Sequence, residues 1–110
     1  MYHKKFFLGN YSNPGTYYNN STFSLVWSIN VSSISNYKNL SANNFYITPK
    51  KIGVHCVTNG LHYADNILDT YLSYDASNGI LYINNWASIV GDSAWIVYGA
   101  IENVDLYYVG

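Results

Sequence analysis

Residues 23–31 read Phe23-Ser24-Leu25-Val26-Trp27-Ser28-Ile29-Asn30-Val31, and this stretch decides the fold class. Every second residue from Phe23 to Val31 is apolar, and most of the residues between them are polar. Successive side chains of an extended strand point to opposite faces, so a period of two gives one apolar face and one mostly polar face. Helical spacing fits this stretch badly. We therefore predict a half-buried β-strand here.

Similar runs, separated by turn residues, continue along the rest of the chain. Turns are expected at 13–15 and 100–103, hairpins at 59–60 and 75–78, and a short helical turn within 35–44. About eight strands follow, over 2–8, 23–31, 45–48, 52–58, 68–74, 79–84, 94–98 and 104–108. This pattern predicts an all-β fold, a small antiparallel, jelly-roll-like β-sandwich. No linker, repeat or composition break divides the chain, so a single domain over residues 1–110 is expected.

Composition limits the function classes. Of the 110 residues 49% are hydrophobic and only 10% are charged, with a net charge of −1 and no arginine. Disorder requires more charge and fewer aromatic residues, and nucleic-acid binding requires clustered cations. No apolar run is long enough for a membrane span, and the first residues lack the apolar core of a signal peptide. Cys56 is the single cysteine, which excludes a disulfide framework.

Catalytic and metal-binding sets are poorly represented. Cys56 follows His55 directly, but adjacent residues on a strand point to opposite faces, so His55 is badly placed to activate the thiol. Cys56 shares its predicted face with Ile52 and Val54, which favours a buried thiol. The histidines have no metal-ligand spacing, and segment 75–79 lacks the carboxylates of a calcium loop. We expect no catalytic residues, no metal and no cofactor; a small hydrolase using Cys56 or a pair of aspartates remains a minor alternative.

Aromatic residues are the main functional signal. Thirteen tyrosines and three tryptophans exceed what one small core needs. An aromatic ring offers a rigid flat face, and the tyrosine hydroxyl adds a hydrogen-bonding group, a combination that matches the C–H faces and hydroxyls of sugars. Trp27 is expected in the core. The candidate ligand-binding residues are those around two predicted loops: Trp86, Asn85, Tyr63, Asp65 and Asp92. Partial burial or a subunit contact is the alternative role for each aromatic.

Three stretches resemble the C-terminal receptor-binding or tip domains of phage tail fibres and baseplate proteins from Gram-positive hosts. These are an opening strand at 2–9, a "yknLtanNF"-like element at 37–47, and a closing hairpin with last strands at 73–81 and 94–98. The resemblance implies a β-sandwich tip, usually a homotrimer, that recognises a bacterial surface polysaccharide or protein. The paired His-x-His ligands with which some fibres hold an axial metal are absent from this sequence.

The leading hypothesis is therefore a non-catalytic receptor-binding module on a virion or in the extracellular space. Its expected partner is a bacterial cell-surface glycan or protein, with neither nucleic-acid binding nor membrane insertion. Two alternatives remain open. The chain could be a structural domain that trimerises or docks to a virion neighbour, or a free lectin-like carbohydrate-binding protein.

Overall fold

The computed structural model describes residues 4–15, 22–56, 60–64, 66–88 and 97–110. Within them the chain forms seven strands and two short 3-10 helices, in the order β1 Lys5–Pro14, β2 Thr22–Asn30, η1 Tyr37–Asn39, η2 Ala42–Asn44, β3 Phe45–Cys56, β4 Gly60–Tyr63, β5 Asn66–Asp75, β6 Ile80–Ser88 and β7 Val97–Val109. The predicted all-β class is confirmed, and the two 3-10 helices lie where a helical turn was expected.

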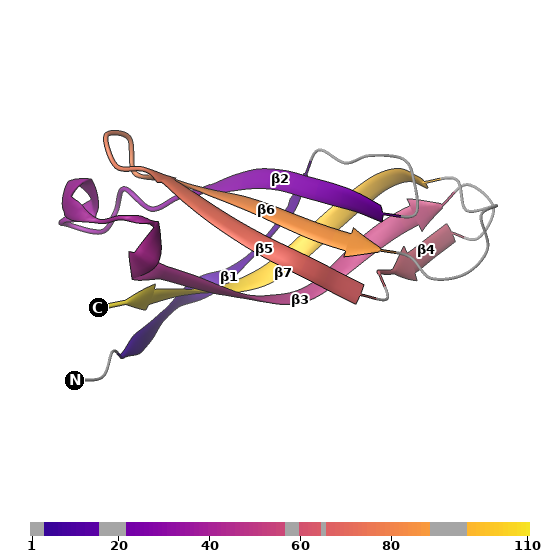
Figure 1. Cartoon of the computed structure of the whole chain (residues 1–110), viewed down its shortest axis with the longest axis horizontal. Coiled ribbons are helices and arrows are strands. Elements are labelled where there is room, and N and C mark those ends of the chain that lie inside the picture. Colours follow the sequence, from indigo (N-terminus) through magenta and orange to yellow (C-terminus); the bar gives the residue numbers. More distant parts are fainter. Residues whose placement is uncertain (1–3, 16–21, 57–59, 65, 89–96) are drawn as a thin grey trace.

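Two antiparallel sheets pack face to face as a small β-sandwich (Figure 1). The four-stranded sheet has the order β1-β7-β3-β4, and the three-stranded sheet has the order β2-β6-β5. Every neighbouring pair runs antiparallel. Each sheet therefore has one inner face toward the core and one outer face on the surface of this domain.

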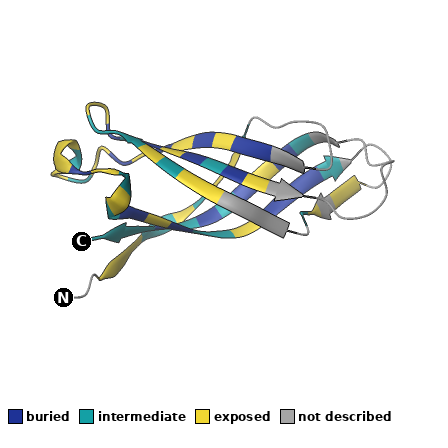
Figure 2. Ribbon diagram, viewed as in Figure 1, coloured by how far each residue is buried: buried dark blue, intermediate teal, exposed yellow. Residues whose placement is uncertain are grey.

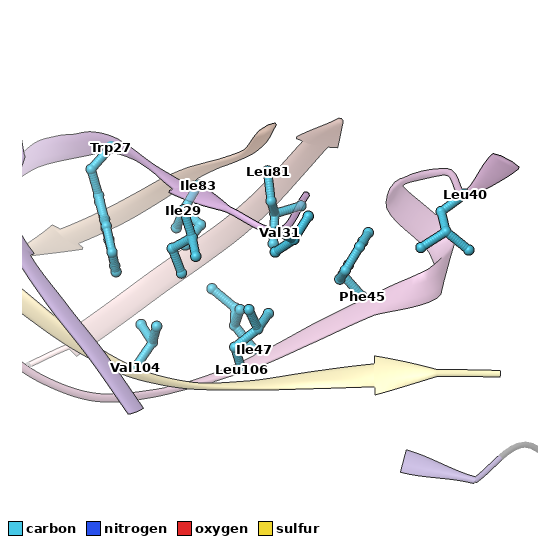
Figure 3. Close-up of a cluster of buried hydrophobic side chains, with 10 residues drawn as sticks. All are labelled: Trp27, Ile29, Val31, Leu40, Phe45, Ile47, Leu81, Ile83, Val104 and Leu106. Atoms are coloured by element: carbon cyan, nitrogen blue, oxygen red, sulfur yellow. The ribbon is translucent and has the colours of Figure 1, made fainter. Parts of the chain in front are cut away.

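The alternating pattern of the sequence fills the core. Along β2, buried and exposed residues alternate, with Leu25, Trp27 and Ile29 inward (Figure 2). They meet side chains from β6, β3 and β7, and Figure 3 shows the resulting cluster of Trp27, Ile29, Val31, Leu40, Phe45, Ile47, Leu81, Ile83, Val104 and Leu106. Burial of these apolar groups is the main favourable term in folding. The predicted strand at 23–31 and the predicted core position of Trp27 are confirmed.

The hairpin between β5 and β6 also forms as expected. Gly79 N–H donates to Asp75 C=O at 2.8 Å, and Asn78 Nδ2 donates to the Asp75 carboxylate at 2.7 Å. Gly79 has φ +67°, and a Cβ there would lie 2.8 Å from Ser32 Cβ. Both the backbone conformation and the close approach therefore require glycine.

Several predicted boundaries are wrong, including the strand end expected at 84 and the turn expected at 13–15, because β6 runs to Ser88 and β1 to Pro14. No bend divides β7 at 100–103, and β3 runs without a break from Phe45 to Cys56. The register of β3 against β7 shifts between Pro49 and Lys51, and such a bulge accommodates a proline that cannot donate to the ladder. β1 likewise continues past Gly9 through a register shift. The predicted hairpin residue Asn59 and most of the strand expected at 94–98 lie outside the described residues.

One polar contact crosses the core between the sheets. Trp27 Nε1 on β2 donates a hydrogen bond to Glu102 Oε1 on β7, and Glu102 is fully buried. Burial raises the pKa of Glu102 to about 7, against the lowering effect of the Trp27 hydrogen bond. Its second oxygen, Oε2, is buried without a hydrogen-bond partner. Glu102 therefore does not lie in a turn, as the sequence predicts. Its carboxyl group is buried and links the two sheets.

Candidate functional site

Three aromatic side chains project from the outer face of the three-stranded sheet. Leu81 and Ile83 of β6 are buried in the core, so the alternate residues Tyr82 and Trp86 point outward. On the neighbouring strand β5, Tyr71 is exposed as well. The exposed fractions are 59% for Tyr71, 42% for Tyr82 and 36% for Trp86. We call this group the aromatic face.

The strand register places the three rings around one amide. Tyr71 lies opposite Asn84, and Tyr82 and Trp86 lie two residues to either side of Asn84 on β6. At about 3.3 Å per residue, Tyr82 and Trp86 are separated by roughly 13 Å, and the adjacent strand is offset by about 5 Å. The aromatic face is therefore a flat triangle, longer than one pyranose ring, with Asn84 between its corners.

Neutral polar groups accompany Tyr82, while Asp69 of β5 is the register partner of Trp86. Ser73 and Ser28 flank Tyr82 on the two adjacent strands. Tyr71 and Tyr82 are both exposed, and Asn84 Oδ1 is buried without a hydrogen-bond partner. A shallow hollow of about 420 Å³ lies between Val26, Tyr71, Ser73 and Tyr82, among others. These rings can cover apolar C–H surface, while the hydroxyls can pair with polar ligand groups.

Cationic groups are absent from this face among the residues that the structure describes. The lysines of the described strands, Lys5, Lys50 and Lys51, all belong to the four-stranded sheet. The aromatic face therefore offers stacking rings and hydrogen-bonding groups but no described ammonium.

The structure separates the residues that the sequence analysis grouped. Trp86 lies within β6, which continues to Ser88, and not at a strand end. Asn85 faces the core and is fully buried, with neither amide atom hydrogen-bonded, so its expected place on a ligand surface is wrong. Tyr63 is exposed on β4 of the other sheet. Asp65 and Asp92 lie outside the described residues.

Sequence reasoning missed Tyr71 and Tyr82. Both lie inside predicted strands, where an aromatic residue is more simply read as core. The period-two run Tyr82, Asn84, Trp86 was available as a signal, because it alternates with Leu81 and Ile83. Placing Tyr71 beside it requires the pairing register of β5 and β6, which the sequence pattern alone does not specify.

Among the described residues, no group of three His, Cys, Asp or Glu side chains comes together as metal ligands, and no helix there is long and apolar enough to cross a membrane. Ile52 and Val54 are buried as predicted, whereas the side chain of Cys56 is not among those that the structure describes.

A scan of protein-family models and searches of the curated proteins and of the solved structures found no match.

Proposed function

We propose that this chain is a non-catalytic receptor-binding module that binds an uncharged stretch of glycan through the aromatic face. The observation that carries the proposal is the arrangement of Tyr71, Tyr82 and Trp86 around Asn84 on an outer sheet face. Rigid rings lose little conformational entropy when a ligand stacks on them, and the tyrosine hydroxyls add hydrogen bonds at the rim.

The shape of the face favours a chain-like ligand. A flat surface covers only one side of a ligand, so a single sugar would bury little area, whereas several linked sugars lying across the rings bury more. The resemblance of segments 2–9, 37–47 and 73–81 to phage tip domains supplies the setting. The glycan is then a bacterial surface polysaccharide, and the module is the host-recognition tip of a tail fibre or baseplate protein.

The experiment is a binding screen of the purified chain on a glycan array and on whole bacterial cells. We expect binding to one or more uncharged glycans and its loss in Trp86→Ala. Tyr46→Ala is the matched control, because Tyr46 is a similarly exposed ring, at 44%, on the other sheet. Binding that persists in Trp86→Ala but disappears in Tyr46→Ala would reject the aromatic face as the site.

A second candidate function, assembly of a homotrimer or docking to a virion neighbour, is favoured by a different set of rings. Phe7, Tyr107 and Tyr46 lie side by side across β1, β7 and β3, with ring centroids 5.5 and 6.1 Å apart. Phe7 is 59% exposed and Phe6 is 52% exposed. This group lies toward the end of the sandwich where both termini emerge (Figure 1). Exposed aromatics of this kind are enriched at subunit contacts.

The molar mass in solution tests the assembly function. A trimer that becomes a monomer in Phe7→Ser, and that binds no cells in either state, would favour assembly as the main role. A trimer in which Trp86→Ala abolishes cell binding without changing the mass would favour the receptor-binding role.

A further inference from the structure

The opposite outer surface, on the four-stranded sheet, is hollowed as well. A groove of about 570 Å³ crosses β1, β7, β3 and β4 there. One side of it is apolar, formed by Leu61 at 54%, Tyr63 at 48% and Ile101 at 42% exposure. Gly53 lies between them, and a Cβ there would lie 3.3 Å from Leu61 Cδ1 and 3.7 Å from Tyr63 Cε1, so these two side chains pack over its backbone.

Most polar side chains of the groove hydrogen-bond or form an ion pair with one another. The amides of Asn10 and Asn103 donate to each other, at 3.0 and 2.8 Å. Asn10 also donates to the Asp105 carboxylate at 2.9 Å, and Lys50 Nζ lies 3.1 Å from the other Asp105 oxygen. The Asn10 hydrogen bond and the Lys50 ammonium lower the pKa of Asp105. The charges of Lys50 and Asp105 therefore cancel at neutral pH.

Lys51 differs from Lys50. Its ammonium lies 4.7 Å from the ring centroid of Tyr63, and among the described residues it has no carboxylate partner. It lines the groove at the boundary between the polar and the apolar sides. After Lys50 and Asp105 are paired, the groove retains one unbalanced positive charge next to an exposed aromatic ring.

We propose that this groove is a second binding site, which takes a sugar bearing one carboxylate, such as a uronic acid. The carboxylate pairs with Lys51, and the C–H face of the sugar ring lies on Tyr63 and the neighbouring apolar side chains. A single unbalanced ammonium matches a single negative charge, whereas a phosphate dianion would need a second one. The proposal does not depend on the aromatic face, which lies on the other sheet.

The positive charge of the groove also argues against a second copy of the chain as its ligand. Lys50 is paired with Asp105, which leaves Lys51 as the unpaired charge described in the groove. A two-fold contact centred on the groove would bring Lys51 of each copy toward the other, and like charges facing each other oppose association at this place. An anionic ligand is attracted by the same distribution.

The test is a titration of the isotope-labelled full chain followed by two-dimensional NMR of its amides, with sodium glucuronate, glucose and glucose 6-phosphate as probes. We expect glucuronate to shift the amide signals of Gly53, Leu61 and Tyr63 and to bind more tightly than glucose. Lys51→Gln should weaken glucuronate binding about tenfold, the effect of one charge-assisted hydrogen bond. Lys51→Arg keeps the charge and should retain most of the affinity.

Two controls keep the result specific. Lys38→Gln removes an exposed lysine of η1, which lies at the opposite end of the sandwich from β4 (Figure 1). This variant should leave the affinity unchanged. Trp86→Ala should also leave it unchanged, so failure of the glycan proposal and failure of this one are distinguishable. Equal affinity for glucose, tighter binding of glucose 6-phosphate, absence of binding, or shifts confined to Tyr71 and Tyr82 would each overturn the proposal.

Discussion

The two outer faces of this sandwich are built by the same strand alternation but differ in chemistry. The three-stranded sheet presents Tyr71, Tyr82 and Trp86 with serine hydroxyls and no described cation. The four-stranded sheet presents a groove in which Lys51 and Tyr63 stand beside a hydrogen-bonded polar network. A chain with 10% charged residues therefore places its strand lysines on one face only.

A low overall charge therefore does not mean that the charged groups are spread evenly over the surface. The aromatic face has rings without a nearby ammonium, and the groove has a ring that an ammonium already contacts. The first suits a neutral ligand that stacks, and the second suits a ligand that replaces the cation–ring contact with an ion pair.

The largest effect concerns the core contact that joins the two faces. The pKa of Glu102 is about 7 in the folded chain, against 4.5 ordinarily, so its protonated form is favoured by folding. The cost of burying the charged form is absent below pH 4.5, grows as the pH rises toward 7, and is complete above that. The full cost is roughly 3 kcal/mol at 1.36 kcal/mol per unit. Urea unfolding at about pH 5 and about pH 8 measures it.

Glu102→Gln is the control for that pH dependence. The amide oxygen still accepts from Trp27, but no charge is buried, so the variant should lose this fall in stability between the two pH values. The lowered pKa of Asp105 acts in a more acidic range, below its ordinary 3.8, and leaves this window unaffected. An identical pH dependence in both proteins would contradict the assigned role of Glu102.

The next effect separates the faces by binding. Trp86→Ala should weaken binding of a neutral glycan identified on the array by about 2 kcal/mol, roughly thirtyfold, as for a central interface residue. Calorimetry of Trp86→Ala and of Tyr46→Ala measures this effect. Equal losses in the two variants would remove the distinction between the faces.

A smaller effect concerns Asn84, whose Oδ1 is buried without a partner at the centre of the aromatic face. Asn84→Leu has a similar shape and removes that unsatisfied oxygen, so we expect stability to rise by about 1 kcal/mol. Glycan affinity should fall, because the amide then no longer pairs with a ligand hydroxyl. Thermal unfolding measured beside calorimetric binding tests both signs, and a loss of stability with unchanged affinity would show that Asn84 is structural.

The smallest effect is that of salt. Raising the ionic strength to about 0.15 M shortens the screening length to about 8 Å and should weaken glucuronate binding a few-fold. Binding of a neutral glycan to the aromatic face should not change. Parallel titrations at two salt concentrations measure the contrast, and equal sensitivity of both ligands would contradict it.

Much of this architecture could be predicted from local sequence. The alternation at 23–31 places Trp27 in the core, and the turn residues at 75–78 form the β5–β6 hairpin. Local signals failed where distant strands decide the outcome. Glu102 resembles a turn residue in the sequence, but in the core Trp27, 75 residues away, donates a hydrogen bond to its carboxyl group.

The candidate site could be predicted only in part, for the same reason. Trp86 and Tyr63 were identified as exposed aromatics, but which outer face each occupies depends on strand order and register. Neighbouring residues of a strand point to opposite faces, so Asn85 faces the core although Trp86 next to it faces outward. Neither the triangle around Asn84 nor the groove beside Lys51 follows from spacing along a single strand.

The most direct test of two distinct faces is hydroxyl-radical footprinting of the aromatic side chains with each ligand in turn. A neutral glycan should protect Tyr71, Tyr82 and Trp86 from oxidation and leave Tyr46 and Tyr63 unprotected. Glucuronate should protect Tyr63 and leave the aromatic face reactive. Protection of the same rings by both ligands, or protection of Tyr63 by the neutral glycan, would contradict the assignment of two distinct faces.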